Sequence, residues 1–224
     1  MIRRMAIVRL TAFRERYLDV LASIYLYNEH RGYTSLDRVL TAARGACPED
    51  AGFIAAIESH RADERKHYVM FRRWFELQGR MPLVTGRGFG HIDHFIGAIF
   101  GCTIDDLDTD AVIADRGAFA RLCRVIALTE ERGLWQVEKL LGNPHVRSDP
   151  AMRRIFEVVH RDEPSHFLPY REWLSAHGQS AARWNERIAD WCIHKLLLLA
   201  RLPALFLDAG APRMERWPDE GEVA

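Results

Sequence analysis

The feature that most constrains the fold of this chain is an internal repeat. When the sequence is shifted by 99 positions, residues 50–79 fall on residues 149–178 with eight identities, whereas ordinary residue frequencies would give about two. The identical pairs are Asp50/Asp149, Glu58/Glu157, Asp63/Asp162, Glu64/Glu163, His67/His166, Arg72/Arg171, Trp74/Trp173 and Gly79/Gly178. A shift of 101 positions places residues 29–32, Glu-His-Arg-Gly, over residues 130–133, Glu-Glu-Arg-Gly. The chain therefore reads as two copies of one pair of segments.

Both repeated segments have the ends of a helix. Asp50 and Asp149 can cap the free amide groups of a first turn, and Pro150 suits the first helical position. Gly79 and Gly178 can close the far ends, because glycine tolerates the left-handed conformation. Apolar residues recur at helical spacing through most of the sequence, and alternation of β-branched residues is almost absent. These patterns predict an all-α fold.

Four long helices are expected, joined by two short connections and one long one. The expected ranges are 11–44 with a bend near Gly32, 50–79, 109–141 and 149–178. The long connection, residues 81–108, is rich in glycine and has room for a short helix at 91–100. This pattern favours a four-helix bundle with a single crossover over residues 1–178. A further helix, 180–201, is expected to pack with the polar tail on the bundle, so that residues 179–224 form a C-terminal extension.

Charge and cysteine content limit the classes of partner and compartment. Lys and Arg together number 31, as do Asp and Glu, so charge gives no support to a nucleic-acid partner. The four cysteines are widely spaced and form no C-x-x-C pair, which predicts reduced thiols. Residues 1–10 lack the apolar core of a signal peptide, and no apolar run approaches the ~20 residues of a transmembrane helix. A cytoplasmic protein without a transmembrane segment is expected.

The repeat preserves residues that bind metals. Glu64 and His67, like Glu163 and His166, form a Glu-x-x-His motif whose two side chains share one face of a helix. Glu29 lies 35 residues before the first motif and Glu130 lies 33 residues before the second, separations that bring an antiparallel helix back to the same depth. Four carboxylates and two imidazoles suit two divalent ions such as Fe(II) or Mn(II). Buried without metals, the carboxylates would be strongly destabilising.

With these motifs, residues 11–178 resemble the ferritin-like di-iron carboxylate superfamily, which includes bacterioferritins, rubrerythrins and di-iron oxygenases. The resemblance implies a cofactor of two Fe ions, with Mn as the alternative at either position, and no catalytic residue beyond the ligands. It further implies that Asp63 and Asp162 hold the ligand histidines by their second ring nitrogen. The implied ligands, of which Glu64 and Glu163 are the expected bridges, are Glu29, Glu64, His67, Glu130, Glu163 and His166.

Several neighbouring residues leave alternatives open. Glu131 competes with Glu130, although the Glu-x-Arg-Gly match favours Glu130. His60 and His160, one turn before the motifs, are expected in an outer or surface position. His91 and His94 are likewise expected at the surface or in a lid, not at a third metal. Pro164 and Pro169 predict that the last long helix kinks or bulges near the metals.

Three classes of function follow from the resemblance. The first is an O2-dependent oxidase or oxygenase acting on a small organic substrate in a pocket shaped by the crossover and the C-terminal helix. The others are iron oxidation and storage, and peroxide reduction without a fused rubredoxin module. The first is favoured, because the crossover and the residues after the bundle exceed what a storage subunit needs. The apolar helix 180–201 also suggests a homodimer interface or a membrane-surface contact.

Overall fold

The computed structural model describes residues 2–218, and side chains from residue 12 onward, and it confirms the all-α class. Within these residues the regular elements are helical, apart from an isolated bridge between Leu83 and Arg213. In chain order they are α1 (Ile2–Ala46), α2 (Ala51–Leu77), the 3-10 turn η1 (Arg87–Phe89), α3 (His91–Phe100), α4 (Thr109–Ala114), α5 (Arg116–Leu141), α6 (Pro144–Arg147), α7 (Pro150–Ala176), α8 (Trp184–Leu196), the π-helical segment η2 (Leu197–Arg201) and α9 (Leu202–Leu207).

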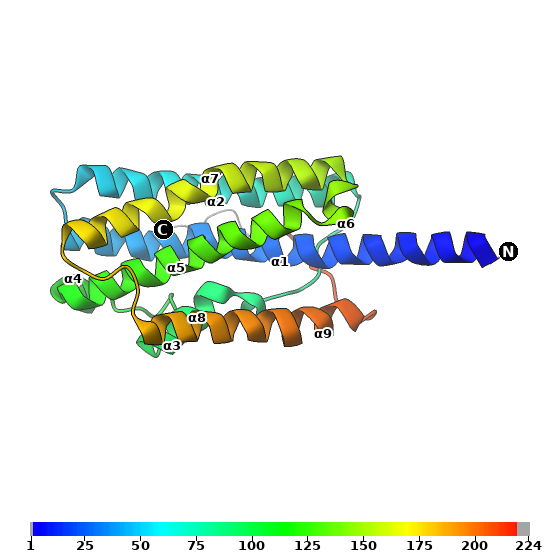
Figure 1. Cartoon of the computed structure of the whole chain (residues 1–224). Coiled ribbons are helices and arrows are strands. Elements are labelled where there is room, and N and C mark those ends of the chain that lie inside the picture. The colour runs from blue at the N-terminus through cyan, green and yellow to red at the C-terminus, as the bar shows by residue number, and fades with distance from the viewer. Residues whose placement is uncertain (1, 219–224) are drawn as a thin grey trace.

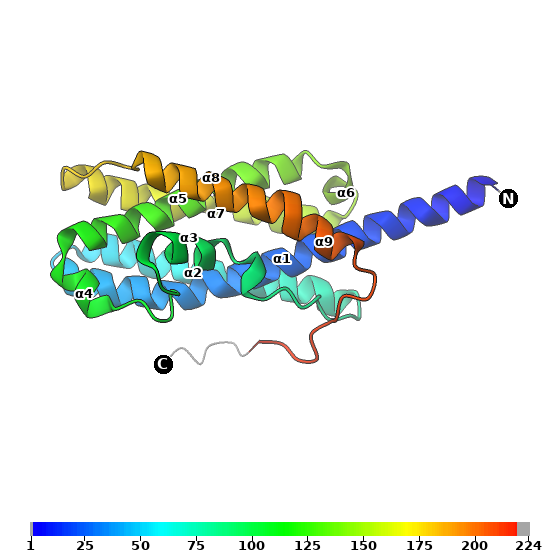
Figure 2. The ribbon, with the colours of Figure 1, turned by 90° about the horizontal axis from the view of Figure 1, so that it is seen from below.

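The helices form three layers. In Figure 1, α2 and α7 lie together at the top, α1 and α5 lie in the middle, and α3, α8 and α9 lie at the bottom. The long helices pack as α1 on α2, α5 on α7 and α2 on α7. Figure 2, seen from below, shows α3, α8 and α9 in front of α1 and α5. We call α3, α8, η2 and α9 the covering layer, because they close the face of the bundle formed by α1 and α5.

Local capping explains where the two repeated helices begin and end. Asp50 Oδ1 accepts a hydrogen bond from Phe53 N at 3.0 Å, and Asp149 Oδ1 accepts one from Met152 N at 2.9 Å. Gly79 and Gly178 follow the last turns with φ angles of 65° and 66°. An L-residue with a side chain would be strained in that conformation. The caps expected from the sequence are therefore confirmed.

Some boundaries differ from the expected ones. The helix expected over 109–141 is broken at Asp115, whose Oδ1 accepts from Gly117 N at 2.7 Å and so caps a new helix, α5. α1 begins before residue 11 and continues unbroken past Gly32. The C-terminal helix begins at Trp184 and, through η2 and α9, reaches Leu207. α7 continues through Pro164 and Pro169 without the π-type form of the predicted bulge, and in Figure 1 its axis changes direction about midway along the helix.

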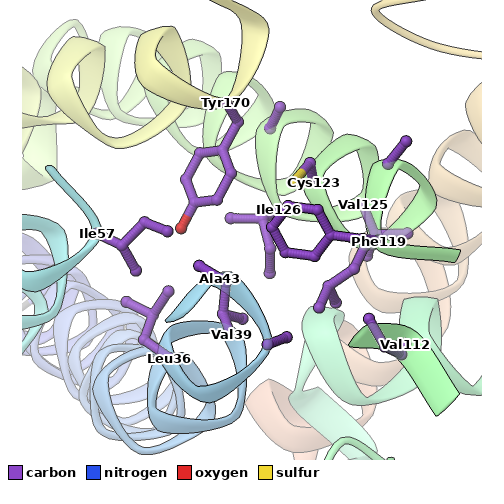
Figure 3. Close-up of a cluster of buried hydrophobic side chains, with 14 of the residues drawn as sticks. Leu36, Val39, Ala43, Ile57, Val112, Phe119, Cys123, Val125, Ile126 and Tyr170 are labelled. Atoms are coloured by element: carbon purple, nitrogen blue, oxygen red, sulfur yellow. The ribbon is translucent and has the colours of Figure 1, made fainter. Parts of the chain in front are cut away.

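Two apolar clusters fill the bundle, one toward each end. One contains the buried apolar side chains within 36–47 and 119–128 together with Ile57, and its aromatic and aliphatic side chains interdigitate in Figure 3. The other contains apolar side chains of α1 from Leu18 to Leu26 with Tyr33, and those of α2 and α7 within 68–75 and 152–159. The gap between the clusters falls near residues 29, 64, 130 and 163, where the predicted ligands lie. Apolar packing thus holds the four long helices in register on both sides of the polar centre.

A buried ion pair fixes the covering layer to the bundle. Arg124 Nε donates to both carboxylate oxygens of Glu186 at 2.8 Å, and both side chains are almost completely buried. Glu186 Oε2 also accepts from Arg183 N, which caps α8. Breaking such a pair strands a charge away from water, so α8 is held firmly on α5. Within residues 2–218, no helix is both long enough and apolar enough to cross a membrane.

Candidate metal centre

The six predicted ligands lie at one level of the bundle, between the two apolar clusters. They are divided among the four long helices: Glu29 on α1, Glu64 and His67 on α2, Glu130 on α5, and Glu163 and His166 on α7. Five are buried, and the Glu130 side chain is 17% exposed. Carboxylates at such depth require a compensating charge or a proton.

The first group of side chains that could hold a metal ion consists of Glu29, Glu64 and His67. Their nearest ligand atoms all lie within 4.8 Å of one another. His67 Nδ1 lies 3.2 Å from Glu29 Oε2. A carboxylate pair with one imidazole is a donor set that suits Fe(II) or Mn(II).

The second group consists of His60, Glu64, Glu130 and His166, again within 4.8 Å. His166 Nδ1 lies 3.3 Å from Glu64 Oε1, and His60 Nε2 lies 3.7 Å from the same oxygen. Glu64 belongs to both groups and is therefore placed to bridge two ions. Glu163 belongs to neither group among the described residues, although its Oε2 lies 3.8 Å from His166 Nδ1.

Protonation of the metal-free centre follows from burial. Burial raises the pKa of Glu29, Glu64 and Glu130 to about 8, and repulsion between the carboxylates adds to it for Glu64 and Glu130. Burial, followed by repulsion from Glu130, raises the pKa of Glu163 well above its usual value. Burial lowers the pKa of His60 to about 3. Near neutral pH the metal-free centre thus keeps its carboxyls protonated and this imidazole neutral, and cations would replace the carboxyl protons.

Several buried polar atoms of the candidate centre lack a hydrogen-bond partner in the part of the chain that the structure describes. Both ring nitrogens of His60, together with His166 Nδ1 and Glu163 Oε2, are buried without a hydrogen-bond partner among the described residues. Buried polar atoms in native proteins are nearly always paired. The rings of His60 and His166 stack with centroids 4.1 Å apart, a neutral arrangement that leaves nitrogen lone pairs available to a metal ion.

Two aspartates fix the ligand histidines, and each does so from the other half of the repeat. Asp162 Oδ2 lies 3.1 Å from His67 Nε2, and Asp63 Oδ2 lies 3.5 Å from His166 Nε2. Lys66 joins the two aspartates, with Nζ 2.8 Å from Asp162 Oδ2 and in contact with Asp63. Hydrogen bonds from His166 and Lys66 hold the pKa of Asp63 well below its usual range. The aspartates are therefore acceptors, so each Nε2 carries the proton and each Nδ1 faces the carboxylate centre.

Two repeated glycines make room for the carboxylates. A Cβ atom on Gly32 of α1 would lie 2.1 Å from Glu64 Oε2, and one on Gly133 of α5 would lie 3.2 Å from Glu163 Oε1. The 2.1 Å contact would force an atom to move, and the 3.2 Å contact would be tighter than most contacts of real Cβ atoms. The carboxylates of Glu64 and Glu163 therefore occupy the space that a side chain at Gly32 or Gly133 would fill.

Beyond the glycines, a cavity of about 370 Å³ lies between the bundle and the covering layer. All four predicted glutamate ligands and both glycines line it. The remaining lining is mostly apolar and includes Ile24, Ile126, Leu197 and Leu202. The candidate centre is thus open on one side to a space of the size that small-molecule sites have, about 300–1,000 Å³.

The repeated arginines fasten the covering layer over this cavity. Arg31 Nη2 donates to Asp93 Oδ1 of α3 at 2.7 Å. Arg132 Nε donates to Asp190 Oδ1 of α8 at 2.7 Å, and Arg132 Nη2 donates to His91 Nδ1 at 2.9 Å. In each copy of Glu-x-Arg-Gly, the glutamate faces the centre and the arginine binds the covering layer. The glycine leaves space for a carboxylate between the centre and the cavity.

Comparison of this chain with protein-family models, curated proteins and solved structures found no match. The functional argument therefore rests on the side chains themselves.

The preference for Glu130 over Glu131 and the surface position expected for His160 agree with the structure, whereas His60 and His91 are buried. His60 is buried beside the centre, whereas the side chain of His160 is 41% exposed and lies 3.8 Å from Glu138. His91 is buried in the cavity wall. Glu131 lies at the surface, paired with Arg171. His60 has no counterpart in the repeat, since Val159 stands at its place, so a search for shared residues passes over it.

Proposed function

We propose that this chain is a ferritin-like di-iron carboxylate protein that oxidises an apolar organic substrate with O2. The observation that carries the proposal is the shared wall between the carboxylate centre and the apolar cavity. Glu29, Glu64 and Glu130 belong to the candidate ligand groups and also line the cavity, and Glu163 lines the cavity beside them. A site that only binds or oxidises metal ions has no need of an apolar cavity beside it. Iron storage and peroxide reduction, the alternative functions, are less well supported for that reason.

The donor set fits two metal ions. One position would use Glu29, Glu64 and His67, and the other would use His60, Glu64, Glu130 and His166, with Glu163 adjacent. Oxygen and nitrogen donors favour Fe(II) or Mn(II) over softer ions. Two cations would offset the four carboxylates, which otherwise remain protonated at considerable depth.

When bound, a pair of Fe(II) ions supplies the electrons with which O2 is activated. The residues of the chain supply the surroundings. Asp63 and Asp162 keep the Nε2 protons of the histidines directed away from the centre. The covering layer, held by Arg31 and Arg132, separates one side of the cavity from bulk solvent. Tyr25 lines the cavity with its hydroxyl buried and without a hydrogen-bond partner among the described residues, so that hydroxyl can meet a substrate.

Metal analysis after anaerobic loading with Fe(II), followed by an optical spectrum on exposure to O2, tests the proposal. We expect about two metal ions per chain. Glu64→Gln or His166→Ala should lower that number, as should Glu130→Gln. Glu131→Gln is the matched control, because Glu131 is adjacent in sequence but lies at the surface. Equal metal content in all of these variants would contradict the assignment of the ligands.

Oxygen uptake then separates the functions. An oxidase or oxygenase should consume O2 faster when an apolar organic compound is added, and it should behave as a monomer or dimer on gel filtration. A particle of about 24 subunits would instead indicate storage, and rapid peroxide turnover by the reduced protein would indicate peroxide reduction.

A further inference from the structure

The cavity beside the centre offers little to a strongly polar ligand. Most polar side chains in its wall are already engaged within the protein. Arg132 is paired with Asp190 and His91. Gln136 Nε2 lies 2.9 Å from His194 Nδ1, and the amide of Asn28 donates to the Ile24 carbonyl at 2.9 Å. Desolvating a polar group without a partner is costly, so the body of a molecule that enters this cavity must be mainly apolar.

The cavity reaches the surface between α5 and η2. Trp135 and Lys139 on α5 and Leu198 on η2 line the cavity and are also exposed, Trp135 by 50% and Leu198 by 42%. Lining residues that are solvent-exposed mark a mouth. The opposite end of the cavity is formed by the carboxylates and by Gly32 and Gly133. A molecule entering at Leu198 would therefore extend from solvent toward the centre.

Lys139 gives the wall of the cavity at its mouth a positive charge. Lys139 Nζ lies 5.6 Å from the centroid of the Trp135 ring, and among the described residues it forms no ion pair with a carboxylate. The other lysine in this region, Lys195, lies over Trp191 and does not line the cavity. An ammonium group at the rim of an apolar cavity is complementary to an anionic group on an otherwise apolar molecule.

We propose that the cavity binds an elongated apolar molecule with one anionic end, which Lys139 holds at the mouth while the apolar end lies against the carboxylate centre. The inference rests on the proposed function, since this molecule is offered as the substrate of that centre. Fatty-acid-like carboxylates have this shape and charge. A purely apolar molecule would fill the cavity but would make no use of Lys139.

Calorimetric titration with decanoate and with decanol tests the inference in both metal-free and Fe(II)-loaded protein. We expect decanoate to bind more tightly than decanol. Lys139→Gln should weaken decanoate by about threefold, the value of one exposed ion pair, and should leave decanol unchanged. High salt should remove the difference between the two ligands. Equal loss for both ligands, or no binding of either, would overturn the inference.

Neighbouring residues in η2 provide a matched pair of variants. Leu198 lines the cavity, whereas Leu199, 69% exposed, does not. Leu198→Trp should narrow the mouth and weaken both ligands by about tenfold or more. Leu199→Trp should change neither, and both variants should keep the melting temperature. Equal effects of the two variants would place binding elsewhere and overturn the inference.

Metal content, measured on the same samples, keeps the two proposals apart. Protein that binds two metal ions but neither decanoate nor decanol would overturn this inference and leave the metal centre intact. Protein that binds decanoate at the mouth but no metal would support the cavity assignment and overturn the proposed function.

Discussion

The helix pairs α1–α2 and α5–α7 carry the same repeated motifs but surround them differently. In both pairs a glutamate faces the centre, an arginine holds the covering layer and a glycine gives a carboxylate room. The first pair adds a buried imidazole, His60, and a lysine, Lys66, between the two aspartates. The second pair has Val159 and Ser165 at those places. The shared parts build and cover the candidate centre, and the unshared parts make its two candidate ligand groups unequal.

Substitution of the two repeated glycines should give the largest difference in metal content between the helix pairs α1–α2 and α5–α7. Gly32→Ala should displace the buried Glu64 carboxylate, which belongs to both ligand groups, and should lower the metal content from about two ions per chain to one or fewer. Gly133→Ala should have a smaller effect, because its Cβ would lie 3.2 Å from Glu163 and not 2.1 Å. Metal analysis of both variants measures this, and equal losses would show that the halves are equivalent at this position.

The aspartates should give the next largest effect. Asp162→Asn should weaken metal binding by about 10–100-fold, because the acceptor that orients the His67 ring loses its negative charge. Asp63→Asn should weaken it less, since its oxygen lies 3.5 Å from His166 and not 3.1 Å. Competition with a chelator measures both affinities. A larger loss of metal affinity in Asp63→Asn than in Asp162→Asn would contradict this order.

The stability of the metal-free protein should depend on pH through glutamates of both helix pairs. The pKa of Glu29 and of Glu130 is about 8, above the usual value for glutamate. A carboxyl whose folded-state pKa is raised stabilises the fold below its unfolded pKa and loses that contribution as the pH rises through 8. The lowered pKa of His60 acts below about 6.5, so the window from pH 6.5 to 8.5 isolates the carboxyls.

We therefore expect the melting temperature of the metal-free protein to fall by several degrees from pH 6.5 to 8.5. Glu29→Gln and Glu130→Gln should each reduce the fall by a similar amount, and saturating metal should abolish it. A melting temperature that rises over this window would contradict the burial of protonated carboxyls.

Substitutions at the equivalent positions Lys66 and Ser165 should give the smallest difference, which we expect in the free energy of unfolding. Lys66→Met removes an ion-paired but partly exposed cation and should lower the free energy of unfolding by at most about 1 kcal/mol. Ser165→Ala should change it by less than about 0.5 kcal/mol. Denaturant unfolding at constant metal loading compares them. A much larger cost for Lys66→Met would mean that the lysine is a main support of the aspartate pair.

Local sequence signals were sufficient for much of the fold. Caps at Asp50 and Asp149 and the glycines that follow the two helices are short-range features, and they predicted the repeated helices closely. The break at Asp115 was missed because the apolar periodicity continues on both sides of it. Pro164 and Pro169 do not end α7, which continues to Ala176 and packs on α5 and α2.

The candidate centre was predictable only where the repeat displays it. The six proposed ligands recur in both halves, but His60 does not, and its burial depends on how α2 and α7 pack. The cavity depends on the placement of α8, which Arg124, Glu186 and Asp190 fix through long-range ion pairs. Such pairs leave no periodic signal in a single sequence.

Anomalous X-ray diffraction from crystals of the Fe(II)-loaded protein tests the central claim most directly. We expect two iron peaks per chain, one beside Glu29 and His67 and one beside Glu130, His166 and His60, with Glu64 between them. Peaks only at the protein surface, or none within the bundle, would contradict the metal centre and the function built on it.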